Sequence, residues 1–179
     1  MRLMRLSQVQ KLLTENGYTY ETKIVPSSVG FYRSKGFHPR RERGPFWLLT
    51  IPNPNHSKNI ELIFADASQD PPLYDLEFGG FWYEWFDCRE EDLHRELLEE
   101  IRRILSEQTY VIFVTDAKTG NWCGDFVYYD LPQEDMNDME AFRRKISQIQ
   151  RPKSMLRKCM GRSRVYELFT WKTYQRIVK

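Results

Sequence analysis

The sequence predicts an α+β fold in which a mostly antiparallel β-sheet is covered by about three helices. Two observations predict this class. Segments with helical periodicity alternate with shorter β-rich segments, and most of the β-rich segments come in pairs joined by turn residues, which favours hairpins over parallel crossovers. With 179 residues, 41% of them hydrophobic, the chain is long enough for one compact core, so we expect a single domain over residues 1–179.

A short helix and a strand are expected at the start of the chain. Ser7 and Gln10 have the spacing of a capping box, and the helix that they begin is expected to end at Asn16, which a glycine follows. Residues 18–24 alternate between apolar and polar side chains, the pattern of a half-buried strand. Residues 26–45 are rich in serine, glycine, proline and basic residues, which predicts a basic mobile loop.

Three strands are expected in the next segment. The β-rich runs 46–51 and 60–64 are separated by a cluster of proline and asparagine residues, so they should form a hairpin. Residues 74–86 are expected to form a third, longer strand. Gly79 and Gly80 interrupt this strand, and we interpret them as a bulge or a bend.

The clearest helix is expected after Asp87, which with Glu90 has the form of a second capping box. Apolar side chains then recur at helical spacing: Leu93, Leu97, Ile101, Ile104 and Leu105. On the outer side of this helix we expect two i, i+4 ion pairs: Glu91 with Arg95, and Glu99 with Arg103.

The last third of the chain predicts a hairpin, a helix and a final strand or hairpin. Residues 109–115 and 121–129 are β-rich and are joined by a loop that contains glycine, so they should pair antiparallel. A third helix is expected over residues 137–149, followed by a basic, solvated connection over 151–164. Residues 165–178 are aromatic and β-branched, and we expect them to close the sheet.

Charges are segregated along the chain, although the net charge is only +2. Residues 61–140 contain 21 acidic and five basic residues, a net charge of −16. The two ends, residues 1–60 and 141–179, contain 22 basic and four acidic residues, a net charge of +18. If the segregation persists in the folded protein, its acidic surface suits a basic partner, whereas its basic surface suits nucleic acid.

Motifs that carry catalytic chemistry are missing from the sequence. His38, His56 and His94 have no second ligand at zinc-binding spacing, and neither a nucleophile elbow nor a phosphate-binding loop occurs. Cys123, beside Gly124, is open to two interpretations, a nucleophile that needs a histidine base or a small buried strand residue, and the second is favoured. We therefore predict neither an enzyme nor a cofactor or metal site.

The sequence also predicts the cellular compartment of the protein. The first residues lack the apolar run of a signal peptide, and the longest apolar runs are far below the roughly 20 residues that a membrane-spanning helix needs. The three cysteines, Cys88, Cys123 and Cys159, form no CxxC pair, which fits a reducing compartment. A cytoplasmic location is therefore expected.

Three aromatic-rich segments stand out in the second half of the chain. They are Leu76-Glu-Phe-Gly-Gly-Phe-Trp-Tyr-Glu-Trp-Phe-Asp87, the stretch from Val111 to Asp125, and the stretch from Tyr166 to Ile177. Together they resemble the small α+β immunity proteins of bacterial polymorphic-toxin systems, specifically the family called immunity protein 59. The resemblance implies a cytoplasmic protein without enzymatic activity that binds and neutralises a cognate toxin domain.

Under this hypothesis, carboxylates and large aromatic rings on one surface are the expected contacts with the toxin, because such side chains dominate tight interfaces and suit a basic nuclease. The candidate partner-binding residues are Asp75, Glu77, Trp82, Glu84, Trp85 and Asp87. Strand side chains alternate between faces, so about half of the aromatic residues here should instead belong to the core. The same alternation places Asp75 and Glu77 on one side, where the pair could alternatively share a metal ion or a proton.

Nucleic-acid binding is the alternative function that the sequence leaves open. Residues 33–43 interleave five basic residues with aromatic rings, a mixture that favours single-stranded nucleic acids. Residues 143–164 add nine basic residues. Against this alternative stand the 21 acidic residues of the central region, which repel phosphates unless the two signs lie on opposite faces.

Overall fold

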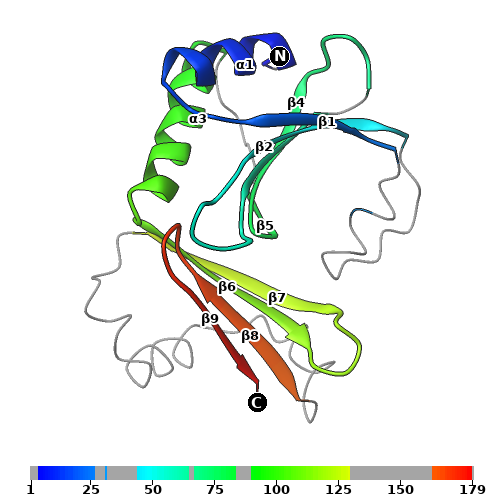
Figure 1. Cartoon of the computed structure of the whole chain (residues 1–179), viewed down its shortest axis with the longest axis vertical. Coiled ribbons are helices and arrows are strands. Elements are labelled where there is room, and N and C mark those ends of the chain that lie inside the picture. The colour runs from blue at the N-terminus through cyan, green and yellow to red at the C-terminus, as the bar shows by residue number, and fades with distance from the viewer. Residues whose placement is uncertain are drawn as a thin grey trace.

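A computed structural model describes residues 4–26, 31, 44–64, 67–83, 90–129 and 163–178. In these residues the chain forms two antiparallel β-sheets and two helices, and Figure 1 shows α3 running from the level of the first sheet towards the second. The α+β class is confirmed. The single sheet that we expected is instead divided into two, and the helix predicted over 137–149 lies outside the described residues.

The first sheet is a five-stranded meander with the strand order β1-β2-β3-β4-β5. Its strands are β1 (Glu21–Val25), β2 (Phe46–Ile51), β3 (Ile60–Phe64), β4 (Leu73–Phe78) and β5 (Phe81–Tyr83). The predicted hairpin of β2 and β3 is confirmed, with Ile51 opposite Ile60.

The prediction of one long strand over residues 74–86 is wrong. Gly79 and Gly80 both have positive φ angles, +58° and +105°, and Phe78 pairs with Phe81, so the two glycines reverse the chain in a two-residue turn. Such turns need positive φ at their central positions, which glycine adopts without steric cost. The glycine pair therefore marks a hairpin rather than a bulge.

The second sheet has four strands in the order β7-β6-β8-β9. They are β6 (Thr109–Asp116), β7 (Trp122–Tyr129), β8 (Arg164–Phe169) and β9 (Tyr174–Val178). The predicted pairing of β6 with β7 is confirmed, and the tail of the chain forms a hairpin, β8–β9, which pairs with the other side of β6.

Helix α1 (Leu6–Glu15) begins one residue before the predicted capping residue. The backbone N–H of Arg5 donates to Oε1 of Gln8 at 2.7 Å, so the box starts at Arg5 rather than at Ser7. Ser7 instead donates from its N–H and its hydroxyl group to the two carboxylate oxygens of Asp70, at 2.9 and 3.1 Å. The predicted end is confirmed, since Asn16 is the C-cap and Gly17 has a φ of +76°.

Helix α3 (Glu90–Leu105) buries the predicted apolar stripe, with Leu105 only partly buried. Arg103 pairs with Glu100 rather than with the expected Glu99, whereas the side chain of Glu91 lies outside the described residues, so its pair with Arg95 stays a prediction. Arg95 lies 2.6 Å from Asp92 and 3.7 Å from Glu99, and Arg103 lies 3.2 Å from Glu100. Residues three apart on a helix are neighbours as much as residues four apart, and here the i, i+3 partners are closer. The predicted cap Asp87 lies outside the described residues.

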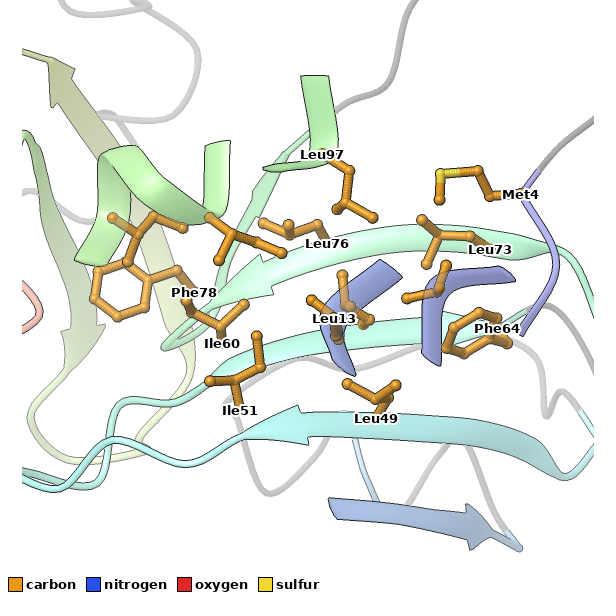
Figure 2. Close-up of a cluster of buried hydrophobic side chains, with 14 of the residues drawn as sticks. Met4, Leu13, Leu49, Ile51, Ile60, Phe64, Leu73, Leu76, Phe78 and Leu97 are labelled. Atoms are coloured by element: carbon orange, nitrogen blue, oxygen red, sulfur yellow. The ribbon is translucent and has the colours of Figure 1, made fainter. Parts of the chain in front are cut away.

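The main hydrophobic core lies between the two helices and one face of the first sheet. Figure 2 shows Leu13 of α1 and Leu97 of α3 gathered with Leu49 and Leu76 of the first sheet. The same cluster continues into the second sheet through Val111, Phe113, Phe169 and Trp171. One continuous core therefore joins the helices and both sheets. None of the described helices has the length and apolar character that a membrane crossing requires.

Candidate interaction surfaces

Asp75 and Glu77 lie on the face of β4 that points away from the helices, because Leu76 and Phe78 between and beside them enter the main core. The sheet register places Asp75 opposite Ile63, and Glu77 opposite Glu61. The two predicted carboxylates thus share a face, but only 7% of Asp75 and none of Glu77 is exposed. In this structure they do not form an exposed acidic surface.

The other four predicted contact residues follow β4 in the sequence. Trp82 lies on β5 opposite Glu77, which places its backbone in the short last strand of the first sheet. Glu84, Trp85 and Asp87 lie outside the described residues. The contact of these four residues with a partner stays a prediction.

A second candidate surface lies along α3 and at the end of β7. We call it the α3–β7 surface and define it by exposed Glu99 and Tyr129 and by the partly buried Asp92, Glu96 and Glu100. The helix contains six acidic and three basic residues, and Tyr129 is 41% exposed. The guanidinium group of Arg103 lies 4.9 Å from the centre of the Tyr129 ring, a cation–π contact.

Electrostatics and burial both act on Tyr129. Burial and the negative charge of Glu100 raise the pKa of its hydroxyl group, and Arg103 partly opposes this rise. Tyr129 reaches α3 because it pairs with Thr109, the first residue of β6, four positions after the helix ends. Arg103 and Tyr129 are distant in the sequence, and the register of the β6–β7 hairpin brings them into contact.

Lys58 forms the centre of a polar contact between the two sheets. Its Nζ lies 3.0 Å from Oε2 of Glu167 on β8, and the two side chains are only 15% and 19% exposed. The same ammonium group lies 5.2 to 5.9 Å from the ring centres of three aromatic residues of the second sheet: Phe113, Phe169 and Tyr174. Tyr174 donates its hydroxyl hydrogen to Oε1 of Glu167 at 2.5 Å. Burial and the adjacent Glu167 raise the pKa of Tyr174 to about 12.

The β4–β5 turn packs closely against this contact. A Cβ atom at Gly79 would lie 2.7 Å from Cε2 of Phe169 and 2.9 Å from Cβ of Lys58, and one at Gly80 would lie 3.1 Å from Phe113. A recess of about 260 Å³ remains beside the turn, lined in part by Ser57, Asn59, Glu61, Thr115 and Gly120. This volume is at the small end for ligand pockets, and it fits a few waters or one inserted side chain.

The histidines and Cys123 have structural surroundings where they are described. Nε2 of His56 lies 2.8 Å from the carbonyl oxygen of Thr170, so this histidine helps to hold the β2–β3 loop against the β8–β9 turn. His94 is exposed on α3, and His38 lies outside the described residues. Half-buried Cys123 packs against the apolar cluster of Ile112, Val114 and Leu168 on the second sheet, which fits the interpretation as a strand residue. Among the described residues, no cluster of His, Cys, Asp or Glu suits a metal ion.

An acidic and a basic segment of the chain meet in the loops at one end of the second sheet. Lys172, from the basic C-terminal end, lies 4.0 Å from Glu107 of the acidic central segment. The basic segments 33–43 and 143–162 lie outside the described residues, so the alternative of nucleic-acid binding stays a prediction.

Asp125 of β7 has the strongest pKa perturbation among the described carboxylates of the second sheet. Burial raises its pKa from 3.8 to about 6, and its own backbone and the nearby Trp122 side chain partly oppose this rise.

Comparison with known proteins adds no relative. No family model, no curated protein and no solved structure matches the chain. The resemblance to immunity protein 59 therefore stays a prediction.

Proposed function

We propose that this protein is an immunity-type protein that acts in the cytoplasm, where it binds and neutralises a cognate toxin domain without catalysing a reaction. The observation that supports this proposal is the α3–β7 surface, where exposed Tyr129 contacts Arg103 of a helix that carries six acidic residues, Glu100 among them near the tyrosine. Tyrosine is enriched among the residues that dominate binding energy at interfaces, and complementary charge accelerates association with a basic partner.

The two parts of the surface have different roles in this proposal. The carboxylates of α3, such as exposed Glu99, attract a basic toxin domain over a distance of about 8 Å at physiological salt. Tyr129 supplies the apolar contact area, and Arg103 restrains its ring before the partner arrives. A ring that is already ordered loses less conformational entropy on binding.

The proposal places the acidic and aromatic contacts on α3 and β7 in addition to Trp82, Glu84, Trp85 and Asp87. Buried Asp75 and Glu77 are left out because their carboxylates are not exposed to a partner. The β5 strand that carries Trp82 contacts β7, the strand that carries Tyr129.

The proposal predicts that a toxin domain is encoded beside this gene, and binding to that domain tests the proposal. We expect the double variant Glu99→Lys and Tyr129→Ala to raise the Kd by at least about tenfold, because each loss at the centre of an interface costs on the order of 1 kcal/mol or more. Glu21→Lys, the same charge reversal on exposed β1, is the matched control and should leave the Kd unchanged. Equal binding by the double variant and the native chain would contradict the role of this surface, and absence of binding by the native chain would contradict the function.

A further inference from the structure

β9 is the outermost strand of the second sheet and is paired on one side only, with β8. Figure 1 shows it along the outer side of β8. Four of its five residues are exposed, including Tyr174 at 38% and Val178 at 57%. An exposed edge strand presents a row of backbone N–H and C=O groups that can pair with another extended chain.

Tyr174, Arg176 and Val178 of β9 share one face of the second sheet. They pair with Phe169, Glu167 and Val165 of β8, and side chains two apart on a strand point to the same side. Ile177 points to the opposite face, where it packs against the cluster around Leu168. The exposed face of β9 thus has a charged residue between two apolar ones.

The charge of Arg176 has no ion-pair partner among the described residues. Glu167, directly across from it on β8, is already engaged, because one carboxylate oxygen contacts Lys58 and the other accepts the hydroxyl hydrogen of Tyr174. Arg176 lies close enough to Tyr174 to lower the pKa of the phenol. An incoming carboxylate is the group that this position lacks.

We propose that β9 binds an extended segment of a partner protein, which adds a strand to the second sheet. The segment carries an acidic residue beside Arg176 and apolar residues beside Tyr174 and Val178. In such strand addition the backbone hydrogen bonds supply affinity, and alternate side chains supply specificity. The assignment of this segment to the toxin domain rests on the function proposed above.

The other described edges suit a partner strand less well. β1 carries Glu21 and Lys23 on one face, so both signs of charge are already present there, and Ile24 is its one exposed large apolar residue. On β7, Tyr129 is the one exposed residue among those whose burial is described. β5 has only three residues.

A second copy of the chain is also a poor occupant of β9. Arg176 is the central residue of the five-residue strand, so antiparallel pairing of two β9 strands about a two-fold axis would place Arg176 opposite Arg176. Like charges directly opposite each other destabilise a strand pair. A segment with an acidic centre avoids this repulsion.

A displayed library of random 12-residue peptides, selected on the whole protein, tests the inference. We expect enrichment of peptides in which an acidic residue is flanked by apolar residues two positions away on each side. Arg176→Glu should abolish binding of these peptides and select basic ones, whereas Lys23→Glu, the matched charge reversal on β1, should change nothing. Hydrogen exchange should show protection of the amides of residues 174–178 in the complex.

Three results would overturn the inference: no enriched pattern, enriched peptides that still bind the Arg176→Glu variant, or protection confined to other residues. A dimer of the native chain that Arg176→Glu dissociates would also overturn it, in favour of a second copy. The selection contains no toxin, so it can fail while toxin binding through the α3–β7 surface stands. Conversely, peptide binding with no toxin binding would leave the β9 site and remove only the assigned partner.

Discussion

Gly79→Ala probes the contact between the two sheets at a single atom. The substitution adds one Cβ, which would lie 2.7 Å from Cε2 and 2.8 Å from Cζ of Phe169, and 2.9 Å from Cβ of Lys58. Real Cβ atoms do not approach other atoms so closely, so the β4–β5 turn or the Phe169 ring has to move. Phe169 is completely buried, which leaves its ring little space to move into.

The expected loss of stability has two parts. Placing a side chain at the positive φ of Gly79, +58°, costs about 1 kcal/mol. Overpacking a buried site typically costs about 1–3 kcal/mol more. We therefore expect Gly79→Ala to lower the free energy of unfolding by about 2–4 kcal/mol, which is a large fraction of the stability of a domain.

Gly17→Ala is the matched control for the backbone part. Gly17 has a similar φ, +76°, but an added Cβ there would meet nothing within 4 Å, so this variant should lose only about 1 kcal/mol. Urea unfolding followed by tryptophan fluorescence and circular dichroism measures both free energies. Equal losses in the two variants would refute the close contact between the sheets. Adding Phe169→Leu to Gly79→Ala should recover part of the loss, whereas no recovery would place the strain elsewhere.

Three further perturbations test other contacts. Lys58→Met should lower the free energy of unfolding by about 3 kcal/mol, because it leaves the mostly buried carboxylate of Glu167 without its cation. Adding Glu167→Gln to this variant should restore part of the lost stability. Urea unfolding measures both free energies, and a loss below about 1 kcal/mol for Lys58→Met would contradict this reasoning. Asp125→Asn should stabilise the fold by about 1–2 kcal/mol at pH 8 and not at pH 3. Because the pKa of Asp125 is raised to about 6, the folded state disfavours the ionised carboxylate, and this cost grows as the pH rises from about 4 to above 6. A gain in stability that does not depend on pH would show that charge is not the cause. Asp70→Ala should cost about 1 kcal/mol through loss of the two hydrogen bonds to Ser7, measured by thermal unfolding, and an unchanged Tm would show that these bonds contribute nothing net.

Local patterns predicted individual elements well where neighbouring residues decide the conformation. The apolar stripe of α3, the stop at Asn16 and Gly17, and the β2–β3 and β6–β7 hairpins all follow from periodicity and turn residues within a few positions. Predictions failed where two local conformations were both compatible with the same residues. Gly79 and Gly80 suit a bulge as well as a turn, and the contacts with Phe169 and Phe113 accompany the turn.

The sequence predicted an acidic and aromatic contact surface that includes Asp75 and Glu77. The structure buries both of these carboxylates, and the surface that we propose on α3 and at Tyr129 follows from the structure alone. A carboxylate on a strand is expected to be exposed when it is not known what packs on that face of the sheet. Burial of Asp75 and Glu77 depends on what lies over that face of the first sheet, which periodicity along one strand does not encode.

Composition and periodicity thus determined the α+β class, the apolar stripe of α3 and most of the described helices and strands, because burial of apolar side chains imposes a repeat of 3.6 residues on helices and of two on strands. The tertiary structure decided the division into two sheets, the Lys58–Glu167–Tyr174 contact between them and the exposed edge of β9. These features join residues such as Lys58 and Glu167 that lie more than a hundred positions apart. Their meeting depends on strand order and register, which the packing of the whole chain selects.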